Sequence, residues 1–392
     1  MKNALYYMQN EKWFFPPFFY PFFYQIGKNV YSCILYLELW YNLELELLLY
    51  NVQLHPQLYP HWKMMTILNY EHQKGGEFVS DGKLRISFQK QPMMRRVIFA
   101  LIPIYIFSIF AYGLNVLLLS LFIFAVGIFV EWLFESKKKK PVSEAVLVTC
   151  MLLTLSMPPN VPIWIAVVAT VVAVALGKEA YGGFGRNVFN PAITGRLFVY
   201  IAFPLFMTKG WVSPSLFGTD AVSSATPLEL LRQGSQISLS NLFFGWRSGS
   251  IGEGPIFLII LAAIYLIATK TASWRIIVST LSSATIMTFL FDIFNVPKAL
   301  PTLPAILSGS LFFISVFMAT DPISAPKKMA SQWYYGIIVG VSGVVIRTFS
   351  LFSEGWSFAI LLGNIFAPLL DELVKDKKSK KPESAQAKKV GL

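Results

Sequence analysis

Residues 114–134 read LNVLLLSLFIFAVGIFVEWLF, an apolar block in which Glu131 is the only charged residue. A helix of roughly 20 residues crosses the ~30 Å hydrocarbon core of a bilayer, so this block predicts a transmembrane helix. The whole chain has the same character: 55% of its 392 residues are hydrophobic and 14% are charged. Soluble proteins carry roughly 25% charged residues. The composition therefore places the chain in lipid.

Similar blocks recur along the sequence and predict an all-α polytopic membrane protein with about ten transmembrane helices. Ten spans divide into two sets of five, and an odd number per set inserts the second half inverted relative to the first. The predicted spans are 95–113, 114–134, 144–158, 160–176, 190–206, 255–270, 274–294, 304–320, 332–348 and 356–374.

The loop charges give a topology for these spans. Cytoplasmic loops of membrane proteins hold an excess of Lys and Arg, and alternate loops of this chain do so. The net charge of +12 is thereby explained without nucleic acid. We expect a multi-pass protein of the cell inner membrane with both termini cytoplasmic and the loop 207–253 extracytoplasmic. The basic residues on the predicted cytoplasmic side are Arg95, Arg96, Lys137 to Lys140, Lys178, Arg186, Lys270, Arg275, Lys327 and Lys328, together with the tail.

The first 63 residues fit none of these blocks, because Pro, Asn, Glu and His interrupt their aromatic and apolar residues. We favour a true start near Met64, with the upstream part an incorrect start. The alternative is an extension whose aromatics lie at headgroup level. The predicted parts are 1–63, a basic cytoplasmic segment 64–94, the first half 95–206, the outer loop 207–253, the second half 254–374 and a basic tail 375–392.

Two segments, 220–229 and 317–326, place polar residues beside the spans. In DAVSSATPLE (220–229), Pro227 forces Thr226 into an extended conformation that presents its hydroxyl. Spacing alone favours a plainer role, in which Thr226 and Glu229 form a capping box. Pro also ends the third span of each half, and in 317–326 this leaves Asp321 at membrane depth, a candidate for an ion pathway. The alternative is that Asp321 caps the following loop.

Two glycine-rich segments complete the set. GKEAYGGFGRNVFNP (177–191) allows close approach of a ligand to the backbone and offers Gly182, Gly183, Arg186 and Asn187 as binding residues. GWRSGSIGE (245–253) offers Arg247, whose guanidinium suits a phosphate. Ordinary turns explain either segment nearly as well. The two cysteines are too few for an iron–sulfur centre within this chain, and we assign neither a metal site nor a catalytic residue.

Taken together and in order, the segments 177–191, 220–229, 245–253, 317–326 and 347–368 resemble one family. It comprises the RnfD subunits of Rnf-type electron-transport complexes and the NqrB subunits of sodium-translocating NADH:quinone reductases, and the resemblance covers about residues 85–375. It implies that Thr226 bears FMN through a phosphoester, transferred from FAD by a flavin transferase. Asp220, Ser223 and Ala225 match the motif around that Thr, whereas Ser224 stands where the family has Gly.

The resemblance further implies one relay in an ion-translocating (Na⁺ or H⁺) oxidoreductase complex, with partner subunits that include a second FMN-bearing subunit. The compact region after Met64 is closer to the Rnf branch. The quinone reductase branch is the alternative, and it implies a second flavin, riboflavin, near 177–191. A nicotinamide site must belong to another subunit, since no dinucleotide-binding fingerprint follows a strand here. A flavin-free channel or secondary transporter is the alternative of another class.

Overall fold

The computed structural model describes residues 87–218, 223–350 and 354–374. The predicted extension 1–63, most of the segment 64–94, Asp220 and the tail 375–392 lie outside the described residues. The predictions made for them stay predictions.

The chain is a polytopic all-α membrane protein, as the apolar blocks predicted. Within the described residues a helical segment lies at each of the ten predicted spans, six of them long and apolar enough to cross a membrane. Their bounds in the first half are α4 Pro92–Tyr112, α5 Leu114–Lys137, α6 Ala145–Ser156, α7 Ile163–Val171 continued by the π-helix η1 Val172–Leu176, and α8 Pro191–Ala202. In the second half they are α12 Ile256–Ala268, α13 Trp274–Ile293, α14 Thr302–Leu307, α15 Leu311–Phe313 continued by the π-helix η4 Ile314–Met318, α16 Met329–Phe349 and α17 Gly355–Leu373.

The eighth span was predicted as one continuous helix, and the structure shows it broken in two. It divides into α14 and α15–η4, because the backbone turns extended at Ser308 and left-handed at Gly309, with φ +86°. The Arg347 guanidinium would lie 2.9 Å from a Cβ at position 309. A broken helix at membrane depth exposes backbone polar groups and is tolerated where it is buried in protein or lines a cavity.

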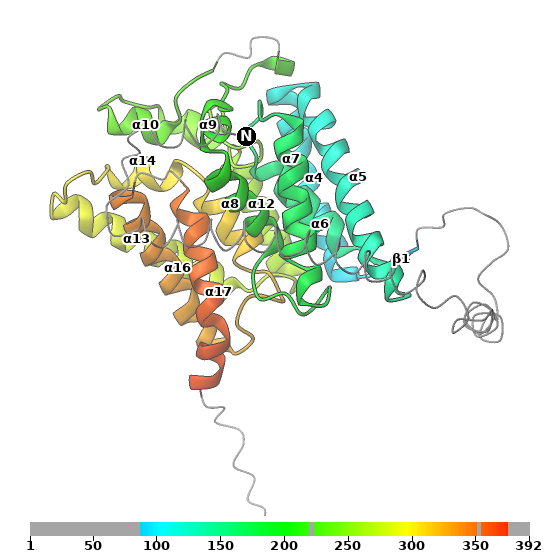
Figure 1. Ribbon diagram of the computed structural model, residues 1–392. Coiled ribbons are helices and arrows are strands. Elements are labelled where there is room, and N and C mark those ends of the chain that lie inside the picture. Colours follow the sequence, from blue (N-terminus) through cyan, green and yellow to red (C-terminus); the bar gives the residue numbers. More distant parts are fainter. Residues whose placement is uncertain (1–86, 219–222, 351–353, 375–392) are drawn as a thin grey trace, which may run out of the picture. The chain divides into compact units, whose positions relative to one another are not determined.

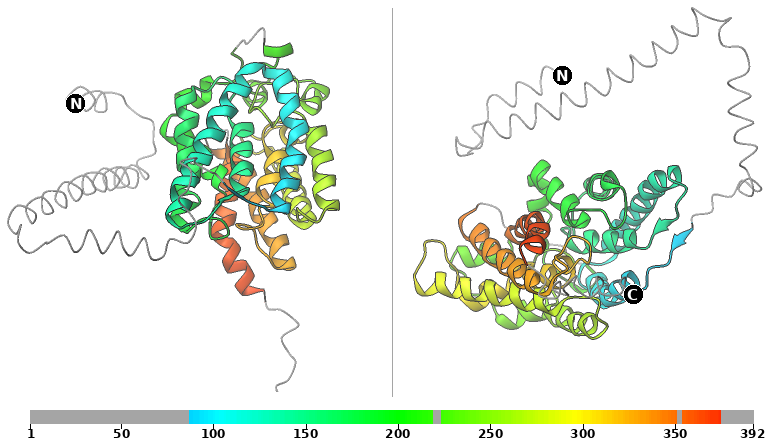
Figure 2. Two further views of the ribbon diagram at one scale, coloured as in Figure 1. Left: turned by 90° about the vertical axis from the view of Figure 1, so that its right-hand side faces the viewer. Right: turned by 90° about the horizontal axis from the view of Figure 1, so that it is seen from below.

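The two halves have the same internal packing. In each half the second helix packs on the fourth, the fourth on the fifth, and the third on the first, second and fifth. Figure 1 shows α4 to α7 (cyan to green) grouped together, as are α13, α16 and α17 (yellow to red), and Figure 2 turns the same groups by 90°.

The halves meet through equivalent helices, α4 against α12 and α8 against α17. The start of α4 meets the end of α12, where Arg96 Nη1 donates to the carbonyl of Thr269 at 2.8 Å. The end of α4 meets the segment before α12, where Ser108 Oγ donates to the carbonyl of Ile251 at 2.9 Å. The equivalent helices α4 and α12 therefore run antiparallel, which is the relation that an inverted repeat requires.

Short elements connect the spans. Strand β1 pairs in parallel with β2, with Phe88 opposite Val142. The long loop between the halves folds back over the helices, and its Val212 and Ser223 form an antiparallel bridge. The remaining bounds are β1 Phe88–Gln89, β2 Val142–Ser143, the 3₁₀ turns η2 Glu179–Tyr181 and η3 Leu216–Gly218, and the helices α9 Pro204–Lys209, α10 Pro227–Arg232 and α11 Leu239–Phe244.

Small residues allow a close helix contact in the second half, between α13 and α16. A Cβ at Gly336 would lie 2.8 Å from Ser279 Cβ and 3.0 Å from the backbone nitrogen of Thr280. Small residues at such contacts let membrane helices approach closely. We expect Gly336→Ala to destabilise the protein by about 1–3 kcal/mol through overpacking.

The measurement is thermal unfolding in detergent, in which Gly336→Ala should melt at a lower temperature. Gly249→Ala is the matched control, because a Cβ there meets nothing within 4 Å. Equal melting of the two variants would contradict this packing.

Candidate functional site

Thr226 lies at the edge of a cavity on the predicted outer side of the molecule. The cavity is open to one side and, counted with its mouth, has about 470 Å³ of space between the loop, the break after α14, the end of α16 and the start of α17. Three of the segments singled out in the sequence, 220–229, 245–253 and 347–368, contribute to its wall. The lining residues are Trp211, Thr226, Pro227, Leu228, Arg247, Ser248, Gly249, Ser250, Glu253, Gly254, Gly309, Ser310, Arg347 and Glu354.

The Thr226 hydroxyl has two neighbours, the helix that it caps and the cavity. Its Oγ1 accepts a hydrogen bond from the backbone nitrogen of Glu229 at 3.4 Å, so the predicted helix cap is confirmed. This bond is long compared with the usual 2.7–3.2 Å. The backbone is extended, with φ −68° and ψ 154°, as Pro227 requires. A weak cap leaves the oxygen's remaining lone pair and proton available to the cavity.

The residues before Thr226 are held by hydrogen bonds to the segment around Val212. Ser223 is exposed and bridges Val212, whereas Ser224 and Ala225 are half-buried. The Ser224 hydroxyl accepts a hydrogen bond from Ser213 Oγ at 2.8 Å, and its backbone is not left-handed. A serine in place of the family's glycine therefore introduces no backbone strain here.

Arg247 is buried in the wall of the cavity and makes its hydrogen bonds to backbone. Its Nη2 donates to the carbonyls of Glu253, at 2.7 Å, and Gly309, at 3.0 Å, while its Nε has no partner. Burial lowers the pKa of this guanidinium, because removal from water disfavours the charged form. No carboxylate forms a salt bridge with it among the described residues.

Arg347, at the end of α16, is held in the same way. Its Nη1 donates to the carbonyl of Ala305 at 2.9 Å and its Nη2 to Ser308 Oγ at 3.0 Å. Its Nε is buried without a partner, and within the described chain it has no carboxylate in salt-bridge range. The cavity is thus lined by two guanidinium groups whose charge no direct ion pair balances.

A third arginine, which does not line the cavity, forms salt bridges with the two carboxylates that do. Arg196 of α8 is completely buried, and it donates to Glu253 Oε1 at 2.8 Å and to Glu354 Oε1 at 2.7 Å. A further bond joins Arg196 Nη2 to Ser250 Oγ at 2.9 Å. With three arginines and two glutamates, the buried cluster carries a formal net charge of +1; Arg232, which donates to the carbonyl of Arg347 at 2.6 Å, is exposed and is not counted. An anion of one charge would balance it.

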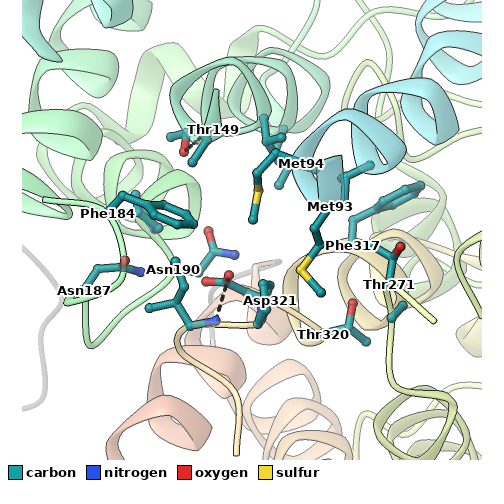
Figure 3. Close-up of a pocket in the computed structure, with 18 of the residues that line it drawn as sticks. Met93, Met94, Thr149, Phe184, Asn187, Asn190, Thr271, Phe317, Thr320 and Asp321 are labelled. Carbon is teal, nitrogen blue, oxygen red and sulfur yellow. Dashed lines mark hydrogen bonds between the residues drawn. The ribbon is translucent and has the colours of Figure 1, made fainter. Parts of the chain in front are cut away.

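A second cavity lies at the opposite ends of the helices, at the junction of the two halves. Figure 3 shows Asn187, Asn190, Asp321 and Met94 gathered around it. Asp321 is half-buried, and burial raises the pKa of its carboxyl. Ser324 Oγ donates to it at 2.8 Å, so Asp321 also caps the following turn. Counted with its open mouth, the cavity has about 670 Å³ of space, and its lining includes Met93, Met94, Thr149, Lys178, Phe184, Asn187, Asn190, Thr271, Phe317, Thr320 and Asp321 together with small and aliphatic residues.

The four binding residues predicted in 177–191 do not lie together in the structure. Asn187 lines the inner cavity, while Arg186 is exposed and packs on Gly182. Gly183 has a left-handed backbone, with φ +97°. A Cβ at this position would lie 2.7 Å from a Glu135 carboxylate oxygen. None of them lines the cavity of Thr226, so this segment and Arg247 lie at different cavities.

Charged pairs lie beneath this glycine turn. Lys178 Nζ contacts Glu131 and donates to Ser143 Oγ at 2.7 Å, with both charged side chains buried. Lys138 Nζ lies 2.8 Å from both Glu135 and Glu179. Lys138 belongs to the basic run used to assign the topology, and the structure gives it a specific role in holding α5 to the glycine-rich segment.

A model of the NQR2, RnfD, RnfE family matches residues 82–380. The chain belongs to this family. The NqrB subunit of the Na(+)-translocating NADH-quinone reductase of Azotobacter vinelandii is 35% identical over 263 residues, which are 64% of each chain. The RnfD-type subunit of the ion-translocating oxidoreductase complex of Actinobacillus succinogenes is 31% identical over 326 residues, 72% of this chain and 92% of the relative. The match thus spans less than two thirds of the reductase subunit.

Membership of the NQR2, RnfD, RnfE family confirms the resemblance inferred from the five ordered segments. Sequence reasoning missed Arg196, Glu253 and Glu354 as site residues. A usable signal was present for Arg196, because an arginine inside a predicted span is costly unless it has a partner. Nothing local to the sequence identified its partners, which are 57 and 158 positions away along the chain.

Proposed function

We propose that this chain is the membrane-embedded, flavin-bearing electron relay of an ion-translocating oxidoreductase complex, with FMN joined through its phosphate to Thr226 Oγ1. The observation that carries the proposal is the outer cavity, where the Thr226 hydroxyl meets two buried guanidinium groups without carboxylate partners. Arginine suits phosphate because its planar fork of donors matches phosphate geometry.

The charges of the site support a phosphodiester in particular. A phosphate esterified both to the flavin ribityl chain and to Thr226 carries one negative charge. The buried cluster carries a net +1, so the modified site is neutral, whereas the unmodified cluster leaves a buried charge unbalanced. Buried charges in proteins are normally paired. Arg247 and Arg347 would hold the phosphate, and the bound flavin would supply the redox chemistry.

Attachment requires a flavin transferase that delivers FMN from FAD. The new bond joins Thr226 Oγ1 to the flavin phosphorus, the pyrophosphate bond of FAD breaks, AMP leaves, and the hydroxyl proton passes to solvent. A tether suits a flavin outside the cytoplasm, where a dissociated cofactor could not be replaced.

Ser224, the departure from the family motif, gives a prediction about this attachment. Because its backbone is not left-handed, glycine is not required at position 224, and we expect Ser224→Gly to change the extent of flavin attachment by less than twofold. Quantifying in-gel flavin fluorescence against total protein measures this. A large gain in Ser224→Gly would show instead that the serine impairs recognition by the transferase.

The relatives support an RnfD role in the complex. The match covers 92% of the RnfD-type relative and 64% of the NqrB relative, although identity is slightly higher to the latter. The partners would be the other subunits, including a second FMN-bearing subunit. The complex would lie in the cell inner membrane, with both termini of this chain cytoplasmic and Thr226 outside.

The inner cavity supports a second ligand or an ion path. Its methionines, aromatics and two asparagines offer the apolar walls and amide groups that a riboflavin ring would use. Asp321 at its floor is our candidate for the path of the coupling ion. The test of the proposed function is a covalent flavin on the peptide that contains Thr226.

A further inference from the structure

The position of Arg196 suggests a function beyond joining helices. It does not line the outer cavity, yet both carboxylates that do, Glu253 and Glu354, are bound to it. These carboxylates share the cavity wall with Arg247 and Arg347. Without Arg196, they would be free to pair with those guanidinium groups and cancel their charge.

We propose that Arg196 is a positioning residue that occupies Glu253 and Glu354, so that Arg247 and Arg347 stay available to the FMN phosphate, and that losing its positive charge lowers the flavin's midpoint potential. This inference rests on the proposed function. Reduction adds negative charge to a flavin, and a nearby positive charge stabilises the reduced form more than the oxidised form. In a buried site this effect is larger than in water.

The groups around Glu354 decide how readily its carboxyl is protonated. Arg196 of α8, Glu253 of the loop and Ser357 of α17 contact or face it, and Arg347 of α16 lines the same wall. Burial raises the pKa of Glu354 while Arg196 opposes that rise. Losing Arg196 would therefore make the carboxyl more readily protonated, so the lowering of the flavin potential in Arg196→Gln should be full at high pH, where Glu354 is ionised, and should shrink as the pH falls and Glu354 takes up a proton.

Four forms of the assembled complex separate charge from structure. At a pH high enough to keep Glu354 ionised, the wild-type cluster formally carries +1, Arg196→Gln leaves 0, Glu354→Gln gives +2, and the double variant returns to +1. The flavin to follow in a redox titration is the component that Thr226→Ala lacks. We expect a lower midpoint potential in Arg196→Gln, a higher one in Glu354→Gln, and a value near wild type in the double variant.

Disruption of structure alone predicts another order. It would shift both single variants in the same direction and the double variant furthest, and that order would overturn the inference, as would equal potentials in all four. If Arg196→Gln does not assemble, Glu354→Gln still decides, because an unchanged or lowered potential contradicts the role given to Arg196. Absence of flavin from the wild-type complex would instead overturn the proposed function, and this inference with it.

Discussion

We expect replacement of Thr226 with Ala to abolish the covalent flavin, so that the denatured chain gives no fluorescent band on a gel. This is the largest effect expected, because the phosphoester has a single acceptor oxygen. The experiment requires co-expression with the complex and a flavin transferase. Denaturation removes any flavin bound without a covalent bond, so a band that persists in Thr226→Ala would place the attachment elsewhere.

A second substitution separates the acceptor from the helix cap. Thr226 also caps α10, and removing a cap costs about 0.5–2 kcal/mol. Thr226→Asn keeps a good capping side chain but has no hydroxyl. We expect it to be as dark as Thr226→Ala while retaining wild-type assembly. A fluorescent Thr226→Asn would contradict the role of the hydroxyl.

The second large effect is expected at the buried pair of Lys178 and Glu131. Their side chains are 2% and 1% exposed, and Lys178→Met leaves a buried carboxyl without its cation. Breaking a buried pair in this way costs about 3–5 kcal/mol. We expect a strongly lowered melting temperature in detergent, and reduced recovery of the folded chain.

The matched control is the double variant Lys178→Met, Glu131→Gln, which removes the uncompensated charge. Replacing both members of a buried pair is much less harmful than removing one, so the double variant should recover most of the lost stability. A double variant less stable than Lys178→Met would show that the two residues act independently.

The helices could be predicted from the sequence because the length of an apolar block is a local property. Block length and basic loops together gave the spans, and the pairing of α4 with α12 agrees with the two halves deduced from an odd count. The break in the eighth span was harder to see. Its cause is the conformation of Ser308 and Gly309 against the Arg347 guanidinium, a contact between distant segments.

The site shows the same division between local and distant information. Thr226 and Arg247 were found from short segments, and the structure places both on one cavity. The segment 177–191 was assigned as a binding segment too, and it lies apart from that cavity, with Asn187 on the inner one. Arg196 was not recognised, because its role depends on carboxylates contributed by the outer loop and the second half.

The most direct measurement is the mass of the peptide that contains Thr226, from the wild-type chain produced with its complex and transferase. We predict an increase equal to flavin mononucleotide less one water, with fragment ions that place it on Thr226. An unmodified mass under these conditions, together with a dark band, would contradict the flavin-bearing role. A flavin-free channel or transporter would then be the better interpretation of the chain.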